Sequence, residues 1–191
     1  MFKKIVFDLY SFGKLAANKR NEKSANETIN TINSIVTVLI DELKVIQNDK
    51  SNNMKDETVK LDFKRNKRLI ENIIADPIHA VRNIGKVAIE KELRQTPELV
   101  IEFINDICLE MISLKSISNA MFATNALKWL GMLCLRNKLE FEILTIIDNL
   151  EEIRKLSYEN KLDRVTNIAI RHHDEINKIH EKMKKDGDLE F

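Results

Sequence analysis

Three histidines and two carboxylates gather in one short stretch near the end of the chain, RHHDEINKIH at residues 171–180. His173 and His180 are seven residues apart and would share a helix face, and Asp174 and Glu175 lie beside them. Zinc proteases need two histidines at i and i+4 with a glutamate between them, and di-iron bundles need Glu-x-x-His on paired helices. Because neither spacing occurs, we interpret the stretch as a solvated face of a terminal helix and expect no metal ion or cofactor. A metal-dependent enzyme is the weaker alternative.

Motifs typical of nucleotide-binding and nucleophilic enzymes do not occur in the sequence. It has no GxGxxG, no GxxxxGK(S/T), and no Ser or Cys in a nucleophile-elbow context. Cys108 and Cys134 both lie among apolar residues, which favours buried free thiols over a disulfide or a metal pair. We therefore expect a protein that is not an enzyme and has no catalytic residues.

The elements that carry these residues are predicted to be helices. Only 4 glycines and 2 prolines occur among 191 residues, whereas proteins built from strands use many of both in their turns. The composition therefore predicts an all-α protein. The formal net charge is +1, but residues 1–94 carry +5 and residues 95–191 carry −4. This asymmetry predicts a basic end and an acidic end.

Neither a secretory signal nor a membrane span is predicted. The first residues, MFKKIVFDLYSFGK, begin with lysines, but Asp8 interrupts their short apolar run. The longest apolar run elsewhere is IVTVLI at residues 35–40, far shorter than a membrane span requires. We expect a cytoplasmic protein.

Two helices are predicted before the first linker. Residues 3–19 have an amphipathic pattern, and SANE at residues 24–27 is a capping box that predicts the start of a second helix. Apolar residues in this second helix follow steps of three and four and form a heptad seam, namely Ile29, Ile32, Val36, Leu39, Leu43 and Ile46. We predict that the seam mediates self-association, with packing against residues 3–19 as the alternative.

A polar stretch at residues 48–57 predicts a linker and divides the chain in two. Residues 1–54 are predicted to form an N-terminal helical extension, and residues 55–191 a helical repeat domain. A basic stretch then follows the linker, with Lys60, Lys64, Arg65, Lys67 and Arg68. These side chains could contact phosphates, although acidic residues interrupt them and Phe63 is the one aromatic among them. Association with nucleic acid is therefore kept as the alternative function.

Three segments match when the sequence is shifted by 42 residues, namely DPIHAVRNIGK at 76–86, SNAMFATNALK at 118–128 and NKLDRVTNIAI at 160–170. Each begins with a residue that favours a helix N-cap, and each has asparagine at its eighth position. These asparagines are Asn83, Asn125 and Asn167. The helices predicted between the segments also match at this shift. A period of 42 residues therefore predicts repeated helical hairpins, with an irregular helical bundle as the alternative.

The first segment resembles the second helix of a HEAT unit, in which Asp-Pro is followed by Val-Arg and small residues. The resemblance to HEAT and armadillo repeats covers about residues 57–175 and implies an α-solenoid-like fold. The second segment departs from it, because no proline follows Ser118 and Thr124 stands where the first segment has Arg82. Within this segment, residues 121–133 are apolar nearly all round, so Trp129 and Leu130 are predicted to lie in the core.

Stacked hairpins would align Asn83, Asn125 and Asn167 in a row. Armadillo proteins are similar in that they hold an extended peptide with asparagines that each have a tryptophan four residues away. Here Trp129 follows Asn125 by four residues, whereas in that family the tryptophan comes first. We predict that these three asparagines and Trp129 bind a partner, with asparagines that are solvated or hydrogen-bonded between helices as the alternative. The sequence thus predicts an interaction or scaffold protein that binds other proteins or itself.

Overall fold

The computed structural model describes residues 2–49 and 57–187, with side chains described for residues 2–48 and 65–187. This part of the chain forms seven helices and no strand, which confirms the all-α prediction. The helices are α1 (Phe2–Asn18), α2 (Glu22–Asp49), α3 (Glu57–Glu90), α4 (Thr96–Ser113), α5 (Ile117–Arg136), α6 (Glu140–Glu159) and α7 (Asp163–Lys185).

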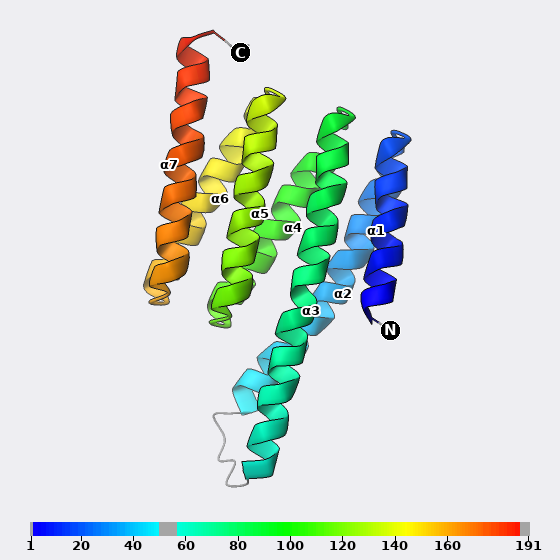
Figure 1. The fold of residues 1–191 in the computed structure, drawn as a ribbon, viewed down its shortest axis with the longest axis vertical. Coiled ribbons are helices and arrows are strands. Elements are labelled where there is room, and N and C mark those ends of the chain that lie inside the picture. The colour runs from blue at the N-terminus through cyan, green and yellow to red at the C-terminus, as the bar shows by residue number, and fades with distance from the viewer. Residues whose placement is uncertain (1, 50–56, 188–191) are drawn as a thin grey trace.

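The helices form two layers (Figure 1). The odd-numbered helices lie side by side in one layer, here called the odd layer, and α2, α4 and α6 form the even layer. Consecutive helices alternate between the layers, so all helices of one layer run in the same direction. Each helical hairpin packs on the next, and the chain is a stack of helical hairpins.

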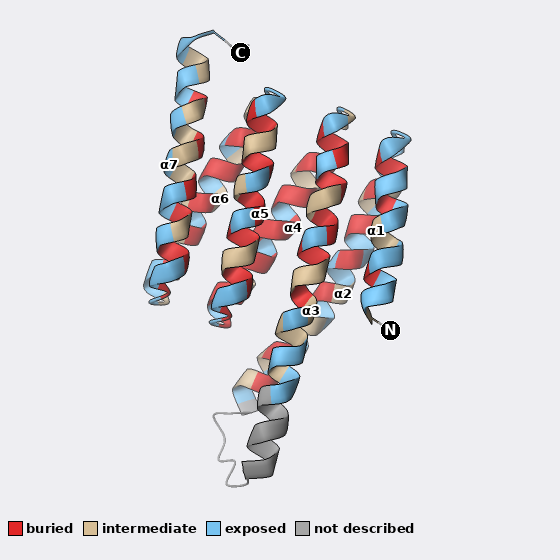
Figure 2. Ribbon diagram, in the orientation of Figure 1, coloured by how far each residue is buried: buried red, intermediate tan, exposed pale blue. Residues whose placement is uncertain are grey.

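One continuous core lies between the two layers (Figure 2). It extends from Ile29 in α2 to Ile176 in α7, so α1 and α2 share a core with the remaining helices across the division predicted after residue 54. Cys108 and Cys134 are buried free thiols within it, as predicted, and burial raises the pKa of both to about 12. Leu130 is fully buried, also as predicted.

The heptad seam of α2 faces this core, not a second chain. Ile29, Ile32, Val36, Leu43 and Ile46 are all buried within the chain, and Leu39 is half-buried against the same core. The self-association predicted for these six residues is therefore corrected, because their own chain already covers them. Helices in a two-layer stack and helices in a coiled coil both bury residues at steps of three and four, so the pattern does not distinguish them.

Two predicted helix starts are also wrong. Asp76 and Pro77 do not begin a helix, because α3 continues through them. Proline in a helix interior removes one backbone hydrogen bond, but Ile74, Ile78 and Val81 are buried on either side of Pro77 and hold α3 against the core. At α2, the helix begins before the predicted capping box, and the Ser24 N–H donates to Asn21 Oδ1 (3.2 Å).

The connections between helices repeat every 23 residues. Glu92, Lys115, Lys138 and Lys161 each follow a helix end with φ between 52° and 59°. The N–H of the next residue then bonds back to a carbonyl five positions earlier, as in Leu162 to Ser157 (2.9 Å). This is the Schellman arrangement, which satisfies the last carbonyls of a helix.

A hairpin of two helices therefore spans 46 residues in this part of the chain, and the predicted period of 42 is wrong. The difference is four residues, about one helical turn. A slip of one turn keeps apolar residues on the same face, so amphipathic helices still match at the wrong shift.

Candidate functional site

One side of α5, in the odd layer, carries large side chains that are exposed or half-buried, and the apolar ones other than Trp129 also pack against the core. These side chains recur at steps of three and four and define the α5 face, which consists of Met121, Phe122, Asn125, Lys128, Trp129, Met132 and Leu133. Trp129 is 36% exposed, which corrects its predicted place in the core. Small buried residues such as Ala123, Ala126 and Gly131 occupy the opposite side of α5 and let neighbouring helices approach closely.

Asn125 joins α5 to α7. Its Oδ1 lies 2.8 Å from His172 Nε2, and its Nδ2 donates to the Met121 carbonyl (2.8 Å). Since Oδ1 only accepts, His172 Nε2 carries the proton and donates. Burial, together with the nearby cations Lys128 and Arg171, lowers the pKa of His172 to about 4. The imidazole is therefore neutral at pH 7 and positions the Asn125 amide.

Arg82 joins α3 to α5 across the tryptophan. Its guanidinium carbon lies 5.0 Å from the centre of the Trp129 ring, in cation–π geometry. The same guanidinium contacts His79 Nδ1 (3.0 Å) and Asn83 Oδ1 (3.4 Å). On the other side of α5, Lys128 Nζ lies 2.9 Å from a Glu175 oxygen on α7. Contacts to both neighbouring helices thus fix the α5 face.

The four predicted partner-binding residues do not form one row. Asn125 and Trp129 share the α5 face, Asn83 is half-buried beside Arg82, and Asn167 is exposed on α7. Neighbouring odd helices pair residues 47 apart, as in Asn125 with His172, so asparagines 42 apart are offset by about one turn. Asn125 also makes two hydrogen bonds within the protein, which leaves fewer of its amide positions for a peptide backbone.

Charge differs between the two layers as well as between the two halves of the chain. Each odd-numbered helix has a net charge of +2. The even helices α2, α4 and α6 have net charges of −3, −4 and −4. Summing charge helix by helix would have found this alternation in the sequence, but it requires the correct helix boundaries.

The even layer has a groove of about 370 Å³ between α2 and α4, lined in part by Asp41, Lys44, Asp106 and Glu110. Lys44 Nζ lies 2.9 Å from Glu110 Oε1, and this ion pair joins α2 to α4 beside the groove. Burial, and then the neighbouring charges of Glu152 and Glu110, raise the pKa of Asp106. Burial is the larger cause of this shift, and the neighbouring carboxylates add to it.

The basic stretch lies on α3. Arg65 and Arg68 are exposed there, and Lys67 Nζ lies 3.7 Å from Glu71. The side chains of Lys60 and Lys64 lie outside the described residues.

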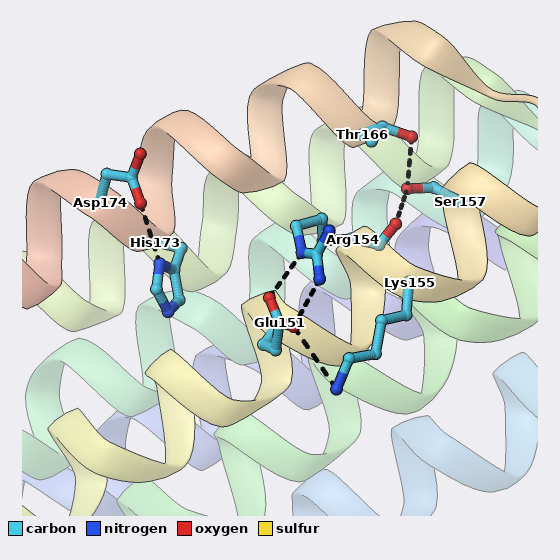
Figure 3. Close-up of polar contacts among 7 residues, drawn as sticks. All are labelled: Glu151, Arg154, Lys155, Ser157, Thr166, His173 and Asp174. Atoms are coloured by element: carbon cyan, nitrogen blue, oxygen red, sulfur yellow. Dashed lines mark hydrogen bonds and ion pairs between the residues drawn. The ribbon is translucent and has the colours of Figure 1, made fainter.

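The histidine cluster lies where α6 meets α7. His172 and His180 are buried, so the predicted solvated face is wrong for these two, and His180 Nε2 lies 3.6 Å from Glu140 Oε1. Figure 3 shows His173 turned toward Asp174 (3.1 Å). No three His, Cys, Asp or Glu side chains among the described residues are arranged to bind a metal ion.

Polar contacts near this junction lie within α6 and between α6 and α7 (Figure 3). Ser157 Oγ on α6 lies 2.9 Å from Thr166 Oγ1 on α7. Glu151 accepts two hydrogen bonds from Arg154 (2.6 Å each) and pairs with Lys155 (3.4 Å). The Ser157–Thr166 contact joins α6 to α7, whereas Glu151, Arg154 and Lys155 pair along α6 itself. These groups converge on no cavity that the structure describes.

Comparisons with known proteins place the fold but not the function. No family model and no curated protein matches the chain. One solved structure that resembles it is titled "DHF46 filament", with 10% sequence identity and a TM-score of 0.50. The match covers 93% of this chain and 97% of that chain. At this identity the likeness concerns the all-α fold alone. Among the described helices, none has the length and apolarity that crossing a membrane would require.

Proposed function

We propose that this protein is a non-enzymatic scaffold that binds a protein partner through the α5 face. The observation that carries the proposal is Trp129, a partly exposed tryptophan stacked under Arg82 on a helix face that also carries two methionines and a phenylalanine. Trp, Phe, Met and Arg are the residues most enriched at protein–protein interfaces, and Trp and Arg dominate their binding energy.

The arrangement favours binding because it is already ordered. Arg82 holds one side of the Trp129 ring, while the Asn125–His172 and Lys128–Glu175 contacts fix the turns beside it. Side chains fixed before binding lose little conformational entropy when a partner arrives. A partner that contacts Trp129, Met121 and Met132 would therefore keep most of the binding free energy that this apolar contact supplies.

A pull-down from source-cell lysate, read by mass spectrometry, tests the proposal with Trp129→Ala as the variant. We expect partners held by the wild-type chain to be lost with Trp129→Ala, since truncating an interface tryptophan costs about 2 kcal/mol or more of binding. Tyr158→Ala is the matched control, because Tyr158 is also an exposed aromatic but lies on α6 in the even layer. Identical protein sets from all three chains would reject the α5 face as the binding surface.

Nucleic acid is a second candidate partner, favoured by the positive charge of every odd-numbered helix. Exposed Arg65 and Arg68 on α3 would contact phosphates, and such contacts weaken steeply with salt. Retention on DNA and heparin columns tests this candidate, with Arg65→Glu and Arg68→Glu combined as the variant. Elution of both chains at the same salt concentration would exclude the basic stretch as a phosphate-binding surface.

A further inference from the structure

The two layers of this protein present opposite charge, and we propose that the acidic even layer of one copy docks on the basic odd layer of a second copy. The proposal goes beyond the scaffold function because it names the partner as the same chain and assigns a role to the even layer. It rests on the proposed function only in placing the α5 face at the centre of the basic side.

Charge complementarity is the first argument. In the even layer, α4 has four acidic residues and no Lys or Arg, and Glu102 and Asp106 are exposed on it. Asp148 and Glu152 are exposed on the neighbouring helix α6. In the odd layer, each helix has an exposed cation, namely Lys14 on α1, Lys86 on α3, Arg136 on α5 and Arg171 on α7. Opposed rows of this kind attract each other and fix a relative orientation.

Apolar side chains on both layers supply contact that charge alone does not. Phe141 and Leu144 are exposed on α6, and Val38 and Val45 are exposed on α2. The odd layer offers the α5 face around Trp129. An interface between the layers would therefore have apolar anchors within a charged surround, as stable protein interfaces do.

A second copy fits both faces at once, which a foreign charged partner does not. Both layers belong to one stack of hairpins, so the even helices of one copy and the odd helices of another both repeat along the stack. The net charge of +1 means that copies do not repel one another over long distances. Because different surfaces meet, the contact is heterologous, and each copy leaves one face open for the next.

Light scattering across protein concentrations tests the proposal. At about 20 mM salt we expect a mass that rises with concentration above the 22.2 kDa monomer, and at about 500 mM salt a return to monomer, because salt screens exposed charges. A wild-type chain that stays monomeric at low salt would overturn the proposal. If the monomeric wild-type chain binds polyglutamate, the odd layer binds a foreign acidic protein and not a second copy. A partner captured through Trp129 would still support the proposed scaffold function.

Charge-reversal variants test which faces meet. The first variant combines Glu102→Lys, Asp106→Lys, Asp148→Lys and Glu152→Lys and makes the even layer basic. The second combines Lys14→Glu, Lys86→Glu, Arg136→Glu and Arg171→Glu and makes the odd layer acidic. We expect each variant to be monomeric alone at low salt and an equimolar mixture to associate. Circular dichroism checks that both variants fold.

A matched control separates faces from net charge. Asp8→Lys, Glu90→Lys, Asp174→Lys and Glu181→Lys together give the same net charge as the even-layer variant, but all four positions lie on odd-numbered helices. This control keeps the acidic face and should still associate at low salt. Equal loss of association in the control and the even-layer variant would show that net charge, and not the docking of opposite layers, controls assembly.

Discussion

Trp129 and Leu130 are adjacent in α5 but have different surroundings, because one residue step rotates a helix position by about 100°. Leu130 points into the core between the layers, and Trp129 lies on the surface under Arg82. Residues 121–133 are apolar on almost every side, so the sequence alone does not decide which neighbour is buried. The positions of α3 and α7 beside α5 determine which of the two residues is buried. The predicted period of 42 residues gives the wrong register between these helices.

Leu130→Ala should destabilise the protein by about 2–5 kcal/mol, because the surrounding core cannot collapse fully onto the lost side chain. Leu144→Ala is the control, since Leu144 is 42% exposed on α6, and we expect it to cost less than about 1 kcal/mol. Urea unfolding followed by circular dichroism measures both. Equal costs for the two substitutions would contradict the described core.

His172 is the residue whose environment makes stability depend on pH. The groups that face it are Asn125 and Lys128 from α5 and Arg171 and Glu175 from its own helix. Burial is the main cause of its low pKa of about 4. The unfolded chain, with a histidine pKa near 6.5, therefore binds more protons than the folded chain between these two values.

Acidification should thus weaken the fold, with stability fully present above about pH 6.5 and lost as pH falls toward about 4. Between about pH 7.5 and 5 the expected loss attributable to His172 is about 2 kcal/mol. His172→Gln should reduce the pH dependence, since glutamine does not titrate and can still donate a hydrogen bond to Asn125. Parallel pH profiles for both chains, measured by urea unfolding, would show that His172 is not the responsible group.

At the scale of the helices, most elements were predictable from local signals. The amphipathic pattern at residues 3–19 agrees with α1 within one residue at each end, and α4 begins at Thr96–Pro97, a pair typical of a helix start. Pro77 and the capping box at residues 24–27 misled, because tertiary packing and a neighbouring Asn21 override them. The alternation between layers was not predictable, since amphipathic helices match at several shifts.

Residues with positive φ at the helix ends should lower the stability of the fold, and this effect can be tested. Lys161 has φ 59°, a left-handed conformation that glycine adopts freely and other residues adopt at a cost of about 1 kcal/mol. Lys161→Gly should therefore stabilise the protein by up to about 1 kcal/mol. Lys178→Gly makes the same change inside α7 and should destabilise it by about 1 kcal/mol. Unfolding midpoints that move in the same direction for both would contradict the assigned helix end.

At the scale of the whole molecule, the all-α class followed from the scarcity of glycine and proline, but the full extent of the proposed binding surface did not follow from any motif. The seam of α2 carries the clearest pattern in the sequence and is buried, whereas the α5 face follows the same steps of three and four and stays partly exposed. Charge summed over halves of the chain does not reveal the separation between the layers, because the fold sorts charge by alternate helices. Neighbouring odd helices bring together residues 47 apart, as in Asn125 and His172. A surface shared by two helices can therefore be recognised only when the register between these helices is known.

The separation of charge between the layers is the central claim, and ion-exchange chromatography tests it most directly. At about pH 7.5, near the pI of 7.7, a chain with evenly spread charge would be held weakly by both resins. We predict that this protein is retained at low salt on a cation exchanger through its odd layer and on an anion exchanger through its even layer. Reversing Lys14, Lys86, Arg136 and Arg171 to glutamate should abolish retention on the cation exchanger and strengthen it on the anion exchanger. Passage of the wild-type chain through either column without retention would contradict the account.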